Sequence, residues 1–204
     1  VVTSIPERRS GSEIEWSLDK RCPCGDFDIV YVKDEKVPRC SGSYDCKISK
    51  KEMLIYFASK SGLDIEGLGR ETVETLIANK LVKNFEDFYS LTYEELISLP
   101  QWKEKKTKNL LEAIEKSKNS EQEKLLPALG IRYVGKQTSK LLVNTFGSIK
   151  NIFDASSDEI NKIHGISESV SNSLIEWYSE DTNKLLIRNL EAVSYTHLRA
   201  HETD

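Results

Sequence analysis

The sequence predicts a mainly α-helical protein in which one helix–turn–helix unit occurs four times, preceded by a small cysteine-rich hairpin. Two observations predict this fold class. The stretch at residues 65–77, IEGLGRETVETLI, is followed by stretches of the same pattern at successive intervals of 34, 32 and 32 residues. All four cysteines lie before the first of these stretches, within residues 22–46. A repeat at a near-constant period indicates one supersecondary unit that is used several times.

The first twenty residues predict an extended segment. Ile14, Trp16 and Leu18 alternate with polar residues, which is typical of a strand with one buried face. A single strand has little to pack against, so we expect residues 1–20 to belong to a domain whose other strands lie upstream. We therefore expect the chain to be a piece of a longer protein.

Residues 21–47 predict a zinc-binding hairpin. Cys22 and Cys24 precede a short apolar stretch, and Cys40 and Cys46 follow it. Two pairs of cysteines separated by a loop are the arrangement of a tetrahedral Cys₄ zinc site, and so small a segment needs a metal to order it. The single residue between Cys22 and Cys24 is fewer than zinc sites usually have. A degenerate site that has lost its metal is the alternative.

Helices are predicted over the rest of the chain, to about residue 192. Thr92, followed three residues later by Glu95, is the pattern of a capping box, and Ser156 and Ser167 mark two further helix starts. Pro127 is expected to kink its helix. No strand pattern occurs in this part. Apolar spacing predicts helices over residues 47–60, 70–80, 104–118, 121–129 and 182–192, with a short connecting helix at 85–91.

Each repeat opens on a turn that leads into an amphipathic helix. In the first copy, Gly67 and Gly69 lie on either side of Leu68. Glycine accepts positive φ and lets another backbone approach closely. A glycine turn that opens a helix also leaves backbone N–H groups without partners, which suits a phosphate oxygen. The pattern is that of the helix-hairpin-helix motif, which binds the DNA backbone without sequence specificity in the families that carry it.

The four turns differ in their glycines. The third and fourth copies keep one each, Gly135 and Gly165, whereas the second has Gln101 and Lys103 in these places. We therefore expect the second turn to hold a phosphate less closely and Trp102 to fill the core. Basic side chains beside the turns could reach phosphates, although ordinary solvated surface explains them equally well. The candidate DNA contacts are Gly67, Leu68, Gly69, Arg70, Lys103, Arg132, Val134, Gly135, Lys136, Gly165 and Ile166.

The composition is that of a globular protein. Of its 204 residues, 30% are charged and 38% hydrophobic, and no run of eighteen apolar residues occurs, so we expect no membrane contact. The formal net charge of −4 is unusual for a DNA-binding protein, because lysine and arginine contacts with phosphates normally dominate affinity. Backbone amides and a local basic face would have to carry the binding.

The order of these parts resembles the bacterial NAD-dependent DNA ligases over residues 1–193. That family has an oligonucleotide-binding (OB) barrel, a Cys₄ zinc finger, four helix-hairpin-helix motifs and a BRCT domain. The resemblance implies the end of the barrel at 1–20, the zinc finger at 21–47 and the helix-hairpin-helix domain at 48–193. It is carried by ERRSGSE leading to CPCG, then RCSGSYDC, FASKSGLDIEGLG, LLEAIEKSK, ALGIRYVG and NKLLIRNLEA.

The resemblance implies nick sealing, in which AMP from NAD is carried on a lysine and passed to the 5′-phosphate. The lysine lies in a Lys-x-Asp-Gly motif in that family, and this string does not occur here. We therefore expect no catalytic residue, no NAD site and no Mg²⁺ site in this fragment, which should be inactive alone and bind Zn²⁺ only. The expected partner is nicked double-stranded DNA, bound by a monomer in the bacterial cytoplasm, at the nucleoid.

Two alternatives remain open at this point. The repeats could belong to a repair nuclease or a branch-migration protein, although the cysteine segment directly before them does not favour this. They could also form a protein-interaction scaffold like death-domain or SAM-type bundles, which have no need of glycine turns. The last residues, 194–204, show neither a period nor a cap. We expect them to be a tail of adapter or vector origin.

Overall fold

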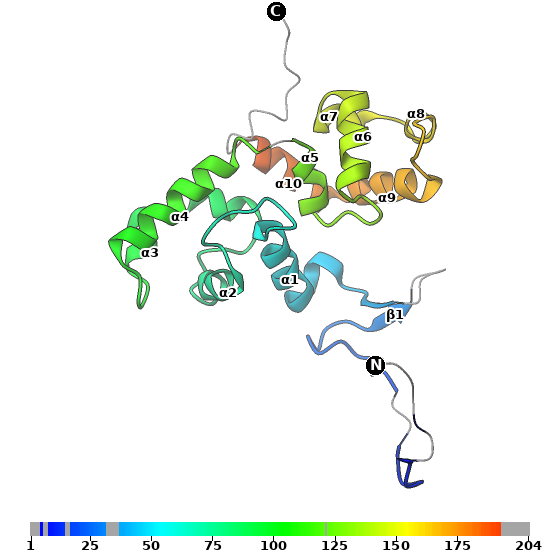
Figure 1. Cartoon of the computed structure of the whole chain (residues 1–204), viewed down its shortest axis with the longest axis horizontal. Coiled ribbons are helices and arrows are strands. Elements are labelled where there is room, and N and C mark those ends of the chain that lie inside the picture. Colours follow the sequence, from blue (N-terminus) through cyan, green and yellow to red (C-terminus); the bar gives the residue numbers. More distant parts are fainter. Residues whose placement is uncertain (1–4, 6–7, 15–16, 32–36, 121, 193–204) are drawn as a thin grey trace, which may run out of the picture. The chain divides into compact units, whose positions relative to one another are not determined.

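The computed structural model describes residues 5, 8–14, 17–31, 37–120 and 122–192 (Figure 1). The chain divides into two compact units, residues 1–50 and 51–204. The tail expected at 194–204 lies outside the described residues, as does Trp16. Around Trp16, residues 8–14 and 17–20 form no strand, and Ile14 is 93% exposed. The buried face predicted for this segment is therefore not found.

The first unit is built around a hairpin. Strand β1 (Ile29–Tyr31) pairs antiparallel with β2 (Pro38–Cys40), with Ile29 opposite Cys40. A short 3₁₀ helix, η2 (Ser43–Asp45), follows β2. Gly42 lies so close to Phe27 that a Cβ at this position would sit 2.3 Å from the phenyl ring, and only glycine fits there. The predicted hairpin is confirmed, with the cysteines forming its core.

The second unit consists of helices joined by turns, and its described residues form no strand. Its helices are α1 (Lys47–Ala58), which begins in the first unit, α2 (Arg70–Ala78), η3 (Glu86–Ser90), α3 (Tyr93–Ile97), α4 (Glu104–Ser117), α5 (Gln122–Ala128), α6 (Lys136–Phe146), α7 (Ile149–Asp154), α8 (Ser157–Asn161), α9 (Glu168–Ser179) and α10 (Asp181–Ala192). The mainly helical fold class is thus confirmed. Within the described residues, none of these helices has the length and apolar character needed to cross a bilayer.

Successive helices of the second unit pack as pairs across short turns. The pairs are α3 with α4, α5 with α6, and α8 with α9 (Figure 1). Helix α10 packs against both α9 and η3. Asn189 of α10 donates a hydrogen bond of 2.8 Å to Glu86 of η3, which joins positions 103 residues apart. The last helix therefore fastens the final repeat to the middle of the chain.

The apolar face of each helix is buried, and this burial is the main source of stability. Phe57 of α1 packs with its ring centre 4.7 Å from that of Phe85 and 6.2 Å from that of Phe88. Leu96 and Leu142, from α3 and α6, are completely buried. The core side chains thus come from the periodic positions that the sequence pattern indicates.

Several predicted helix ends are confirmed. Thr92 and Ser156 each form a capping box, with Glu95 and Glu159 respectively. Pro127 lies inside α5, in its last turn, and the helix ends one residue later, shortly before Gly130, which has a φ of +72°.

Candidate nucleic-acid interface and metal centre

All four repeat turns have the same backbone hydrogen bond. In each, the N–H of the fourth residue donates to the C=O of the first, which closes a β-turn just before the helix. The donor–acceptor distances are 3.1 Å for Leu68 to Ile65, 3.2 Å for Trp102 to Leu99, 3.2 Å for Val134 to Ile131 and 3.1 Å for Ile166 to Ile163. The repeat seen in the sequence is therefore a repeat of local structure.

The third residue of every turn has a positive φ. The values are +88° for Gly67, +66° for Gln101, +61° for Tyr133 and +91° for Gly165. A turn of this type requires such a φ at its third position. Glycine meets the requirement without strain, whereas glutamine and tyrosine adopt it at a cost.

The second turn does not depart from the others in its backbone. Its missing glycines predicted a turn that holds a phosphate less closely, yet Gln101 takes the positive φ and Lys103 is extended, with φ −126° and ψ 160°. The difference from the other turns lies in the side chains at these two positions. Trp102 is 7% exposed, which confirms its predicted place in the core.

The residue that joins each of the four repeat turns to its helix is extended and adds no side-chain cap. Gly69, Lys103, Gly135 and Ser167 precede α2, α4, α6 and α9, and at none of these four positions does a side chain accept a bond from the first helical turn. The leading N–H groups of these helices thus have no acceptor on the N-cap side chain. Together with the positive end of the helix dipole, they favour an anion.

The two N-cap glycines are not required by the fold. Gly69 and Gly135 have φ values of −70° and −86°, which any residue can adopt. A Cβ built at either position meets no heavy atom within 4 Å. The absence of a side chain keeps open a space through which a ligand can reach the amides.

Two of the predicted contacts bury their side chains. Leu68 is 2% exposed and Val134 is 4% exposed. Ile166, the equivalent residue of the fourth turn, is partly buried. Leu68 and Val134 can therefore present only their main chain to a ligand.

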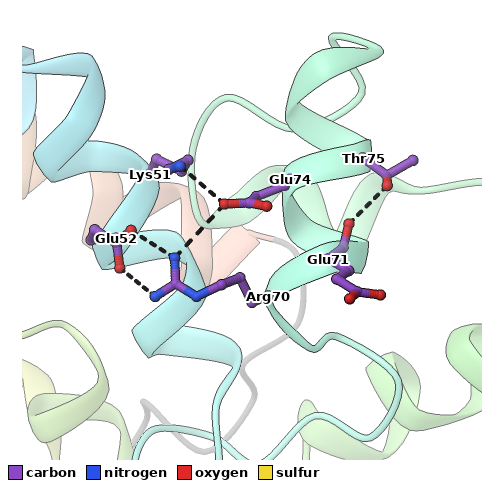
Figure 2. A network of polar contacts seen from close by, with 6 residues as sticks. All are labelled: Lys51, Glu52, Arg70, Glu71, Glu74 and Thr75. Atoms are coloured by element: carbon purple, nitrogen blue, oxygen red, sulfur yellow. Dashed lines mark hydrogen bonds and ion pairs between the residues drawn. The ribbon is translucent and has the colours of Figure 1, made fainter.

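Arg70 is already engaged by carboxylates (Figure 2). Its guanidinium donates to both carboxylate oxygens of Glu52, at 2.8 and 2.7 Å, and lies 3.7 Å from Glu74. Lys51 also pairs with Glu74, at 3.0 Å. The hydrogen bonds from Arg70 lower the pKa of Glu52, and those to Glu52 raise the pKa of Arg70. Glu71 follows Arg70 directly in the sequence. Together with Glu52 and Glu74 it gives the first turn acidic surroundings.

The third turn, in contrast to the first, has basic surroundings. No Asp or Glu occurs from Lys124 to Phe153, a stretch with five basic residues in a chain of net charge −4. Arg132 lies within the turn, and Lys136 is the first residue of α6 and is exposed. The second turn is also basic, and there the Lys106 ammonium lies 4.1 Å from the centre of the Trp102 ring. The repeat pattern predicted where the turns lie, but it did not predict the difference in charge between the first turn and the third.

The four cysteines converge. Their Sγ atoms all lie within 4.8 Å of one another, and Cys22, Cys24 and Cys46 are buried. The Sγ atoms of Cys22 and Cys46 are 3.9 Å apart, far beyond the roughly 2 Å of a disulfide. Thiolates at about 2.3 Å from one tetrahedral ion are about 3.8 Å apart. The single residue between Cys22 and Cys24 is therefore no obstacle to a shared metal.

The thiols are unequal in acidity. Burial raises the pKa of Cys46, but hydrogen bonds from Ser49 and from neighbouring thiols outweigh it and bring the pKa to about 6. A hydrogen bond from the Cys24 amide lowers the pKa of Cys22, yet burial and the other thiols raise it to about 12. A bound cation would favour the thiolate form of all four. The donor set fits a soft divalent metal such as zinc.

Comparisons with known proteins agree with this geometry. The family model for the helix-hairpin-helix motif matches residues 124–187, which include the third and fourth turns. The chain is 36% identical over 205 residues to a DNA ligase of Anoxybacillus flavithermus, and 39% identical over 191 residues to one of Geobacter sulfurreducens. A DNA ligase of Desulforamulus reducens is 36% identical over 203 residues. These matches cover 100%, 93% and 99% of the chain but 30%, 28% and 30% of the relatives. The predicted resemblance to DNA ligases is confirmed.

Proposed function

Because the chain is related along its length to DNA ligases, of which it spans about 30%, we propose that it is the DNA-gripping portion of an NAD-dependent ligase that seals nicks. The observation that carries the proposal is the set of four turns with the same backbone hydrogen bond, each followed by a helix whose first amides lack an N-cap side-chain acceptor. These amides can donate hydrogen bonds to phosphates, and contacts with phosphates do not distinguish one base sequence from another.

The proposed contacts are of two kinds. Main-chain contacts come from the turns at 67–69, 134–135 and 165–166, and charged contacts come from Lys103, Arg132 and Lys136. Arg70 can join them only by leaving Glu52. Three cationic contacts on duplex DNA give a salt slope of roughly 3, at about 0.9 for each phosphate neutralised. That slope is shallow for a protein that spans several phosphates.

The ligation chemistry itself belongs to a part of the ligase outside these residues, since no Lys-x-Asp-Gly motif occurs. The chain's own part would be to hold duplex DNA around the nick as a monomer in the bacterial cytoplasm. The cysteine cluster would hold one Zn²⁺, with Cys22, Cys24, Cys40 and Cys46 as ligands, and so order the hairpin.

An anisotropy titration tests this function. The chain is titrated with nicked duplexes of two unrelated sequences, with an intact duplex and at two salt concentrations. We expect similar affinity for the two sequences and the shallow slope given above. No binding at low salt would overturn the function, and it would favour a protein-interaction scaffold instead.

A further inference from the structure

We propose that Tyr133 is a nucleic-acid contact residue: its ring packs on the deoxyribose next to the phosphate held by the third turn. The inference rests on the proposed function and adds to it a side chain that the sequence pattern did not single out. Tyr133 is the third residue of its turn, two positions before Gly135. Two steps along the chain span at most about 7.6 Å between Cα atoms. The ring is thus close enough to touch the neighbour of a phosphate bound at Gly135.

Tyr133 is an exposed aromatic residue at a position with an unfavourable backbone conformation. The side chain is 55% exposed, and Ile131 and Val134, each 4% exposed, supply the apolar contacts of the turn. Its φ of +61° is unfavourable for a residue with a Cβ, at roughly 1–2 kcal/mol. In two of the other turns, glycine holds the same position. An exposed aromatic residue two positions before open amides is well placed to contact an external ligand that binds them.

The surroundings of Tyr133 identify that ligand as anionic. The guanidinium of Arg132 lies 5.7 Å from the centre of the tyrosine ring. Lys136 is exposed at the start of α6, and no carboxylate occurs within the stretch from Lys124 to Phe153. An amphipathic ring beside two cations suits a sugar–phosphate chain, in which apolar sugar faces alternate with charges. The contact should therefore be independent of base sequence.

The chain offers a matched pair of variants to test the contact. Tyr133→Gly removes the ring and relieves the positive φ, so thermal stability should stay the same or rise. Gln101→Gly makes the same backbone change in the second turn, where no aromatic ring is lost. We expect Tyr133→Gly to weaken binding of a nicked duplex about tenfold, the effect of losing one aromatic contact. Gln101→Gly should leave affinity within about twofold.

A direct readout does not depend on any variant. Iodination of tyrosines, quantified by mass spectrometry, should be blocked at Tyr133 when the wild-type chain is saturated with nicked duplex. Tyr56, which is 42% exposed on α1, is the internal reference and should stay reactive. Unchanged reactivity at Tyr133, unchanged affinity of Tyr133→Gly, or an equal loss in Gln101→Gly would each overturn the contact. In all three cases the wild-type chain still binds DNA, whereas failure of the proposed function would show as no binding at all.

Discussion

At the scale of single residues, the N-cap glycines give the sharpest test of amide binding. Gly135→Val should weaken DNA affinity about tenfold, because a branched side chain fills the approach to the amides of α6. The fold should tolerate the change, since φ is −86° and a Cβ meets no atom within 4 Å. Gly69→Val should weaken binding for the same reason. Affinity by anisotropy and stability by thermal melting are measured on the same samples.

The control variant for this prediction must leave the backbone of the second turn unchanged. Gln101→Val would place a branched residue at a φ of +66°, so it would disturb the turn itself. Gln101→Asn is suitable, because asparagine tolerates positive φ. It should leave DNA affinity unchanged. A loss equal to that of Gly135→Val would rule out the amide account.

The pair of Glu52 and Arg70 predicts a dependence of stability on pH. The pKa of Glu52 in the folded chain lies below its ordinary value of 4.5, mainly because Arg70 donates hydrogen bonds to the carboxylate. The contribution of the pair is therefore present above pH 4.5 and is lost as the pH falls through the depressed pKa. Because the two side chains are 47% and 53% exposed, it is at most about 1 kcal/mol.

Thermal melting across pH checks the role of this pair. Glu52→Gln should lower the melting temperature at neutral pH and have no effect in strong acid. The same change at exposed Glu191 should have no effect at either pH. A difference between Glu52→Gln and the wild type that persists in acid would mean that lost packing is responsible.

At the scale of elements, two serines that both mark helix starts in the sequence differ in whether their side chains cap the helix. The Ser156 hydroxyl accepts a bond from the Glu159 amide, and the Ser156 amide donates the reciprocal bond to the Glu159 carboxylate, whereas Ser167 makes no side-chain cap. Ser156→Ala should therefore lower the free energy of unfolding by about 1 kcal/mol. Ser167→Ala should cost much less. Chemical denaturation of the two variants measures both values, and equal losses would contradict the capping assignment.

Elements with a strong local signal were predictable, and those set by distant contacts were not. The period of α4 and the box at Thr92 both lie within a few residues, so the sequence pattern reveals them. Helix α7 has only six residues and was not predicted, although Ser148 caps it. Ile14 fits an alternating pattern but has no sheet to join within the described residues.

Part of the candidate site could be predicted from local sequence patterns, and part of it could not. Cysteine clustering predicted the metal ligands because they are close in sequence. The geometry of the second turn was not predictable, because a pattern of missing glycines does not show that Gln101 accepts a positive φ. The partner of Arg70 lies 18 residues away on another helix, and no local pattern reveals such a pair.

At the scale of the whole molecule, the two units should respond differently to metal removal. The first unit has a small core made mostly of cysteines, whereas the second has a core of large apolar side chains. A strong chelator should therefore abolish protection from hydrogen exchange in the first unit, for example at the N–H of Ser41, which donates to Asp28. The N–H of Leu81, which donates to Leu76, should stay protected.

Metal analysis completes this test. The purified chain should contain about one equivalent of zinc, and Cys24→Ser should lose most of it. The second unit of Cys24→Ser should keep its helical circular dichroism. Metal content well below one equivalent in the wild type, or unchanged exchange after chelation, would contradict a structural metal.

The separation of charge along the chain also has a consequence for how the protein is handled in the laboratory. A net charge of −4 predicts retention on an anion-exchange resin at neutral pH. The carboxylate-free stretch from Lys124 to Phe153 should at the same time adsorb to heparin, a sulfated polyanion. One sample should thus bind to two columns of opposite charge, and this pair of chromatograms would reveal the basic stretch before any DNA is added.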